Sequence, residues 1–264
     1  NQGQGSGLLL SCIVRGNVGG VGGGFYLFKG TVRNTLVYNN SAANAGGGQV
    51  DQGDFQNCTI VSNRATSGVG GLFLGSGALI ENTIVYFNEG TNYAQGGGSP
   101  TFRNTCSLPL PTGVGNTASD PQFVSAAAED FHLNLSSPLI DAGTNRPWMT
   151  GAQDLDGFPR IWNSIVDMGV YEIVAPVMLD VTNDPVFVTY DTTTYQVGGS
   201  NNANVVGSLV VSNAANGAAA SFPAISPWVT PFLPLVPGPN TFIVTGTNEY
   251  GVMAKDSVVI TRGG

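Results

Sequence analysis

The sequence predicts an all-β protein, in which a parallel β-helix, a solenoid of short coils, precedes an immunoglobulin-like β-sandwich. Three observations predict this fold class. A seven-residue motif ending in asparagine recurs early in the chain, glycine clusters precede most of its copies, and the last third alternates apolar and polar residues between turn residues. We expect solenoid coils over residues 1–118, the last coils and a cap over residues 119–173, and the sandwich over residues 174–264.

The motif reads NTLVYNN from Asn34, NCTIVSN from Asn57 and NTIVYFN from Asn82, with weaker copies from Ser11 (SCIVRGN) and Asn104 (NTCS). The copies begin about 22 to 25 residues apart, a period shared by leucine-rich repeats and β-solenoids. The leucine pattern is missing and no helical stretch fits between the copies. Each repeat should therefore form one coil, stacked about 4.8 Å from the next.

Side chains along the motif should alternate between the two faces of a strand. Positions two and four carry small or β-branched residues, which suit the inside of a thin coil. Positions three and five should then point outward, although several of them are large and apolar. Such a surface marks contact with another molecule, or equally a face covered by the cap or the sandwich. The predicted assembly surface is Leu10, Ile13, Leu36, Tyr38, Ile84 and Tyr86.

The seventh motif position is asparagine in all four complete copies. Asparagine at a turn tolerates left-handed backbone geometry and bonds neighbouring backbone through its amide. Stacked asparagines can also hydrogen-bond to one another along the axis, as in cross-β ladders. The simpler alternative is a set of turn residues on a solvent-exposed edge of the solenoid. We favour an internal structural ladder of Asn17, Asn40, Asn63 and Asn88.

The cysteines are expected to be unpaired. Cys12 and Cys58 share the second motif position but lie two coils apart, about 9.6 Å at the strand spacing, which exceeds disulfide reach. We expect both to be buried. Cys106 falls one position later, on the outward side, with no evident partner. Without a CxxC pair or a histidine cluster, a zinc site is not expected.

Charge and hydropathy exclude two classes of partner. The formal net charge of −8, with only 10% charged residues, argues against a nucleic-acid partner, which requires clustered lysine and arginine. No run of 18 apolar residues offers a membrane span. The surface must be built from asparagine, serine, threonine, glycine and some apolar side chains.

Four segments in residues 119–173 carry a family resemblance: DPQFV from Asp120, DFHLNLSSPLIDAG from Asp130, DLDGFPRI from Asp154 and VDMGVYE ending at Glu172. With the coil motif, they resemble the C-terminal part of secreted β-helix proteins of the choice-of-anchor type. The resemblance implies a right-handed parallel β-helix, an extracellular or cell-surface location and no established catalytic activity. The segment should cap the open end of the solenoid.

The region that follows resembles the immunoglobulin-like modules of bacterial surface proteins. About seven short strands are expected there, and the Cys…Trp…Cys pattern of antibody domains is absent.

No cofactor is expected, with calcium as the one alternative. The DLDG run resembles the opening of a calcium loop, so Asp154 and Asp156 are candidate ligands. The favoured alternative is an Asx turn with pairing to Arg160.

The acids of the first 118 residues are too scattered for a polysaccharide-cleaving site, which needs clustered carboxylates. Asp51 and Asp54 belong to one coil, and Glu81 and Glu89 to the next. His132 is expected to pack in the cap rather than act as a base.

The sequence thus favours a non-enzymatic extracellular structural protein for surface display, adhesion or head-to-tail filament assembly, with further copies or other surface proteins as partners. The alternative is a carbohydrate-binding or polysaccharide-cleaving β-helix.

Overall fold

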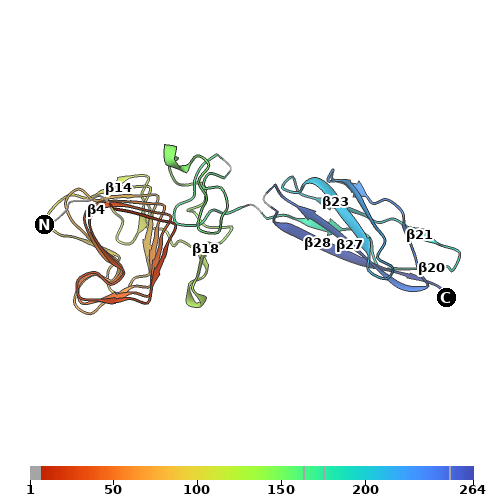
Figure 1. Ribbon diagram of the computed structural model, residues 1–264, viewed down its shortest axis with the longest axis horizontal. Coiled ribbons are helices and arrows are strands. Elements are labelled where there is room, and N and C mark those ends of the chain that lie inside the picture. The colour runs from red at the N-terminus through yellow and green to blue at the C-terminus, as the bar shows by residue number, and fades with distance from the viewer. Residues whose placement is uncertain (1–6, 163, 175, 250) are drawn as a thin grey trace. The chain divides into compact units, whose positions relative to one another are not determined.

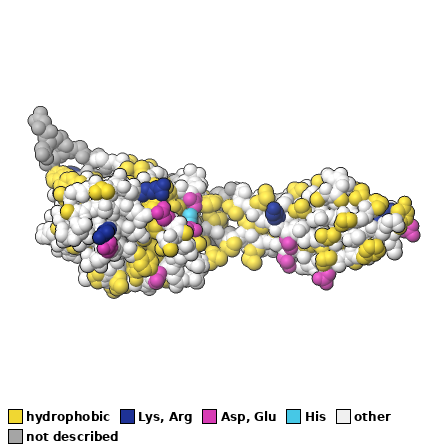
Figure 2. All heavy atoms as spheres, turned by 90° about the horizontal axis from the view of Figure 1, so that it is seen from below, with side chains coloured by type: hydrophobic (Ala, Val, Ile, Leu, Met, Phe, Trp, Pro, Cys, Tyr) yellow, Lys and Arg dark blue, Asp and Glu magenta, His cyan; other side chains and the backbone are white. Residues whose placement is uncertain are grey.

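The computed structural model describes residues 7–162, 164–174, 176–249 and 251–264. The chain divides into two compact units, Asn1–Val174 and Ala175–Gly264. The first is a parallel β-solenoid with a laterally packed cap, and the second is built from mainly antiparallel sheets (Figure 1). Charged side chains are sparse on the face seen in Figure 2. No helix in the described part of the chain is long and apolar enough to cross a membrane.

Three parallel sheets run along the solenoid. The first has the order β1-β4-β7-β11-β14-β16, and β10 pairs with β7 and β13 beside this path. Its strands are β1 (Gly7–Leu10), β4 (Phe25–Arg33), β7 (Gly48–Gln56), β10 (Leu72–Leu74), β11 (Leu79–Glu81), β13 (Tyr93–Gln95), β14 (Thr101–Arg103) and β16 (Gly113–Val114). The second sheet contains β2 (Ile13–Arg15), β5 (Leu36–Tyr38), β8 (Thr59–Val61), β12 (Ile84–Tyr86) and β15 (Cys106–Ser107). The third contains β3 (Val18–Gly19), β6 (Ser41–Ala42) and β9 (Arg64–Ala65).

The register of the second sheet places equivalent motif positions side by side. Val14 pairs with Val37, Val37 with Ile60, and Ile60 with Val85. These side chains belong to the solenoid core together with Phe55 and residues of the first sheet. The prediction that motif positions two and four face the interior is therefore confirmed, and the repeat defines one coil.

Left-handed backbone geometry occurs at motif positions one and six, and not at position seven, where it was expected. Asn57 and Asn82, at position one, have φ of +52° and +48°, and Asn39 and Ser62, at position six, have φ of +52° and +55°. The ladder asparagine at position seven has no positive φ among the described residues. The preceding residue makes the turn, which leaves the seventh residue free to direct its backbone N–H and its side chain toward one acceptor.

The cap covers the flank of the solenoid and not its end, contrary to the sequence-based expectation. It contains the antiparallel pair β17 (Phe123–Ser125) and β18 (Asp130–Leu133), joined by a short 3₁₀ helix, Ala126–Ala128, and followed by irregular segments with a second one, Pro147–Met149 (Figure 1). Its apolar side chains pack on the outer face of the second sheet. A flank position gives the cap a large apolar surface to bury.

Four residues of the predicted assembly surface are consequently buried within the unit. Leu36, Tyr38, Ile84 and Tyr86 are no more than 9% exposed, so the expectation that they form an outer contact surface is wrong. Leu36 and Tyr38 share an apolar cluster with cap residues, and the other two contribute to a second such cluster. Leu10 and Ile13 remain 50% and 56% exposed, although the cap reaches the first described coil through the ion pair of Glu129 with Arg15 and through a pocket that Leu10 lines with cap residues.

The second unit has three sheets around its own apolar core. One has the order β19-β22-β25, one the order β20-β28-β27-β23-β24, and one pairs β21 with β26; all pairs are antiparallel except β20 with β28. Trp228, Phe242 and Leu209 are buried in this core. The strands are β19 (Leu179–Val181), β20 (Val186–Val188), β21 (Thr194–Tyr195), β22 (Gly198–Asn201), β23 (Val206–Asn213), β24 (Ala219–Pro223), β25 (Trp228–Val229), β26 (Leu233–Pro234), β27 (Gly238–Thr247) and β28 (Met253–Arg262).

Candidate functional site

The ladder asparagines form one hydrogen-bonded row. Asn40 Oδ1 accepts both the backbone N–H and the Nδ2 of Asn17, each at 3.0 Å. Asn63 Oδ1 accepts the same two groups of Asn40, and Asn88 Oδ1 those of Asn63, at 2.9 to 3.0 Å. Asn40 and Asn63 are buried. The row thus satisfies backbone donors at successive turns where water has no access.

The row continues to a residue that the motif does not include. Asn92 Oδ1 accepts the backbone N–H and the Nδ2 of Asn88, at 3.0 and 3.1 Å, and Asn92 Nδ2 donates to the carbonyl oxygen of Leu108 at 2.8 Å. The row is therefore closed at its C-terminal end. At its other end Asn17 is exposed, and its Oδ1 accepts no hydrogen bond from the residues that the structure describes. Asn92 lies outside the repeated motif, so periodicity does not reveal it.

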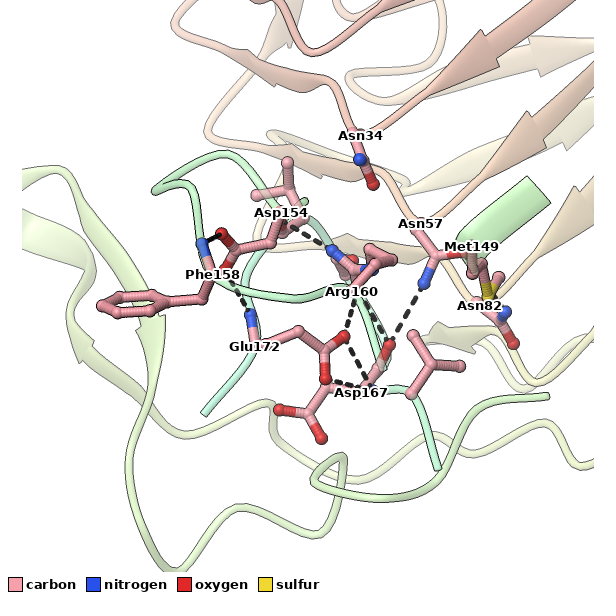
Figure 3. Close-up of polar contacts among 12 residues, drawn as sticks. Asn34, Asn57, Asn82, Met149, Asp154, Phe158, Arg160, Asp167 and Glu172 are labelled. Atoms are coloured by element: carbon pink, nitrogen blue, oxygen red, sulfur yellow. Dashed lines mark hydrogen bonds and ion pairs between the residues drawn. The ribbon is translucent and has the colours of Figure 1, made fainter. Parts of the chain in front are cut away.

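A second row of asparagines holds the cap on the solenoid. It consists of the residues at motif position one, whose left-handed turns aim their side chains outward. Asn82 exchanges two hydrogen bonds with the backbone of Thr144, with Nδ2 donating at 2.9 Å and Oδ1 accepting at 2.8 Å. Asn34, Asn57 and Asn104 donate to the carbonyl oxygens of residues 153, 167 and 142, in that order. Figure 3 shows Asn34, Asn57 and Asn82 beside the cap.

Sequence reasoning assigned no role to this second row. The signal was nevertheless visible, because position one is asparagine in the four copies that begin at Asn34, Asn57, Asn82 and Asn104. The row required a partner that periodicity cannot supply, since the cap segments that it binds follow the coils by 38 to 119 residues. One motif therefore carries two rows, one inside the turns and one facing the cap.

Arg160 lies at the centre of the cap and is fully buried (Figure 3). Its Nη1 donates to the carbonyl oxygen of Val170 at 2.9 Å, and its Nη2 donates to that of Gly169 at 2.8 Å. The Nη2 atom also lies 2.7 Å from Glu172 Oε1. The sequence-based pairing of Arg160 with the two aspartates is thus corrected to an ion pair with Glu172.

Burial dominates the titration of this cluster. It lowers the pKa of Arg160 and raises that of Glu172, while the attraction between the two opposes both shifts. Burial raises the pKa of Asp167 to about 6, although the backbone N–H groups of Asp141 and Ile173 stabilise its carboxylate. A buried set of this kind holds local backbone through the bonds of the Arg160 Nη atoms, and perturbed pKa values by themselves do not make it catalytic.

The two candidate calcium ligands have separate partners. Asp154 Oδ1 accepts the backbone N–H groups of Asp156 and Phe158, at 3.0 and 2.8 Å, and its Oδ2 accepts that of Glu172 at 2.8 Å. Asp156 Oδ2 lies 2.6 Å from His132 Nε2. This geometry is the Asx turn that the sequence favoured over a calcium loop. Across the described ranges, no group of three His, Cys, Asp or Glu residues is placed to hold a metal ion.

His132 joins two segments of the cap. Its Nδ1 lies 2.6 Å from Asp130 Oδ1 and its Nε2 lies 2.6 Å from Asp156 Oδ2, so both ring nitrogens face carboxylates. The ring stacks on Tyr171 with 3.9 Å between centroids. Burial opposes the charged imidazolium, but the two carboxylates outweigh it and raise the pKa of His132 above 6.5. The residue therefore acts as a clamp between β18 and the DLDG turn.

The four carboxylates of the coils have separate surroundings and share no partner. Asp51 accepts hydrogen bonds from Tyr26 Oη and Gln49 Nε2, at 2.5 and 2.9 Å. Glu81 is buried and pairs with Arg146 of the cap. Exposed Glu89 pairs with Arg64, and burial raises the pKa of Asp54. Each of the four acids thus lies in a different environment.

The three cysteines are free thiols. Cys58 is buried inside the coil as expected, whereas Cys12 is only partly buried because it lies in the first described coil. Cys106 lies on the outward side of its strand but is buried beneath the cap, where its Sγ donates to the carbonyl oxygen of Ser119 at 3.2 Å. Burial raises the pKa of both Cys58 and Cys106 to about 12.

Comparison with known proteins identifies no family. No family model matches the chain, and no curated protein matches it. A search of solved structures finds an engineered protein with 18% sequence identity and a TM-score of 0.27. That alignment covers 40% of this chain and 24% of the engineered protein, so the chain spans about a quarter of its length.

Proposed function

We propose that this chain is a non-enzymatic extracellular structural protein that assembles end to end through its solenoid. In this proposal, the solenoid is a right-handed parallel β-helix of the choice-of-anchor type, and the second unit is an immunoglobulin-like module. The buried polar groups support a structural role, because both asparagine rows and the Arg160 cluster bond to backbone or to one another. Surface display and adhesion are the roles that such an assembly would serve.

The observation that carries the proposal is the outer edge of the first coil that the structure describes. Strands β1, β2 and β3 are the terminal strands of their sheets, so their outer backbone groups have no neighbouring strand among the described residues. Leu10 and Ile13 are exposed there beside Leu8 and Val18. Asn17 Oδ1, to which no described residue donates, lies at the same end. Exposed edges and apolar side chains together form a surface on which another coil can stack.

The opposite end of the solenoid offers a complementary surface. Strand β16 is the last strand of the first sheet, and Leu108, Leu110 and Val114 are exposed near it. Contact between unlike ends of two copies is heterologous, and it propagates as a filament unless its rotation closes a ring. Burial of the apolar groups would supply roughly 25 cal/mol per Å². The partners are therefore further copies of the chain, and the proposal requires no cofactor.

The test introduces charge at the first coil. Leu10→Asp and Ile13→Asp should shift native material from filaments or oligomers to monomers, as measured by light scattering after size exclusion and by negative-stain electron microscopy. Leu135→Asp is the matched control, because Leu135 is an exposed leucine in the cap, away from the first coil. Monomeric wild-type protein at millimolar concentration would refute assembly, as would oligomers that persist in both first-coil variants.

A further inference from the structure

A groove of about 300 Å³ runs along the side of the solenoid, away from the first-coil contact and the cap. Three consecutive coils line it with residues from their loops and strands. The loop residues are Asn44, Gly68, Val69 and Thr91, and the strand residues are Gln49, Phe73 and Ala94. The volume lies at the lower limit of the range typical of small-molecule sites.

Strand register fixes the floor of the groove. Gln49 pairs with Phe73, and Phe73 pairs with Ala94, so these residues form one row across β7, β10 and β13. Their neighbours in β10, Leu72 and Leu74, are fully buried, which shows that the row faces outward. The ring of Phe73 is therefore held at the surface by a buried strand, and Gly68 contributes no side chain to the cavity.

The same row ends in a second aromatic residue. Tyr26 of β4 pairs with Gln49, and it is more than half exposed. Tyr26 and Phe73 are thus two strands apart, about 9.6 Å at the ordinary strand spacing. Gln49 lies between them, and Asp51 fixes its amide and the Tyr26 hydroxyl by hydrogen bonds of 2.9 and 2.5 Å. The arrangement is two aromatic rings with an oriented polar group between them.

The chemistry of the lining selects a class of ligand. No described residue that lines the groove is charged. The amides of Asn44 and Gln49 and the hydroxyl of Thr91 both donate and accept, which suits hydroxyl groups of a ligand. Aromatic rings offer an apolar face on which the C–H face of a sugar ring can pack. The adjacent carboxylate of Asp51 disfavours an anionic ligand through like-charge repulsion.

We propose that this groove binds an uncharged oligosaccharide, with Phe73 and Tyr26 stacking on successive parts of the chain and Gln49 bonding a hydroxyl between them. This inference is independent of end-to-end assembly, because it involves neither the first-coil contact residues nor β16. It gives the protein a binding activity in addition to its structural role.

Binding is tested by titration calorimetry on the full chain with cellohexaose, chitohexaose, maltohexaose and hexagalacturonate. At least one of the three neutral hexasaccharides should bind with a Kd below about 1 mM, and hexagalacturonate should bind at least about tenfold more weakly. Gln49→Ala and Phe73→Ala should each weaken the neutral ligand about tenfold or more. If Phe73→Ala does not fold, Thr91→Ala, an exposed position, takes its place.

Phe187→Ala is the matched control, because Phe187 is an exposed aromatic residue of the second unit. It should leave the Kd unchanged. Three results would overturn the proposal: no neutral hexasaccharide bound at 10 mM, hexagalacturonate bound as tightly as the neutral ligands, or an unchanged Kd in the groove variants. The oligomeric state of the same samples, measured in parallel, reports on assembly separately.

Discussion

Arg160 Nη2 and Glu172 Oε1 lie 2.7 Å apart in the cap, and neither side chain is exposed to solvent. The segment that separates them in sequence folds around Arg160, which donates to three of its carbonyl groups. Hydrogen bonds to the guanidinium thus hold the backbone of this segment where no regular secondary structure does so. A cap with two short strands and two single-turn helices needs such a centre, because few of its backbone groups pair with each other.

Replacement of Arg160 by methionine should destabilise the first unit by about 3 to 5 kcal/mol, since the buried carboxylate of Glu172 would lose its cationic partner and three carbonyl groups would lose a donor. The double variant Arg160→Met/Glu172→Gln should recover part of this loss. Urea unfolding monitored by tryptophan fluorescence measures both values. Equal stabilities of wild type and Arg160→Met would show that the cluster does not hold the cap.

Each inner ladder residue should contribute through the partners that it satisfies. Asn63→Ala removes the acceptor of the Asn40 backbone N–H and the side-chain donor to Asn88 Oδ1 in a buried site, so we expect a loss of about 1 to 3 kcal/mol. Asn40→Ala and Asn88→Ala should behave alike. Asn17→Ala is the internal comparison, with a smaller loss because this residue is exposed and ends the row. Wild-type melting temperatures in the three inner variants would contradict a stabilising ladder.

The His132 clamp predicts a particular pH dependence. The folded-state pKa of His132 is raised above 6.5, so its contribution is fully present below pH 6.5 and is lost as the pH rises through the folded-state value. The pKa of Asp130 is lowered, since its hydrogen bonds to His132 outweigh burial, and its contribution is lost as the pH falls below 3.8.

Wild type should therefore exceed His132→Gln in melting temperature by a margin that is largest between about pH 4 and pH 6.5 and shrinks at alkaline pH. Differential scanning calorimetry from pH 4 to pH 9 measures this margin. Glu89→Gln, at an exposed pair on another coil, is the control and should show no such window. Parallel curves for wild type and His132→Gln would exclude a titrating clamp.

The thiols should differ in reactivity although all three are reduced. Alkylation of native protein at pH 8 should modify Cys12 first, because burial raises the pKa of Cys58 and Cys106 to about 12 and shields both. Mass spectrometry after denaturing, non-reducing alkylation should then show all three labelled. A bridge between Cys12 and Cys58 would mean that the coil register is wrong.

Periodic features could be read from the sequence, and contacts between distant segments could not. The interior positions Val37, Ile60 and Val85 and the row at Asn40 and Asn63 follow from a repeat that places equivalent residues one coil apart. The repeat also predicts that Leu36 and Ile84 point away from the coil, but the residues that cover them lie in the cap, about 50 to 130 positions later in the chain. The clusters around Arg160 and His132 likewise join turns without any repeat to reveal them.

The asparagine row also gives the solenoid a direction. The carboxamides of Asn17, Asn40 and Asn63 each donate to the asparagine oxygen of the next coil, and that of Asn88 donates to Asn92 Oδ1 within its own coil. The amide dipoles are therefore aligned head to tail along the axis. A coil inserted in reverse would oppose two oxygens or two NH₂ groups. An insertion or deletion in such a chain therefore keeps the asparagine row intact only if it comprises whole coils in the same orientation.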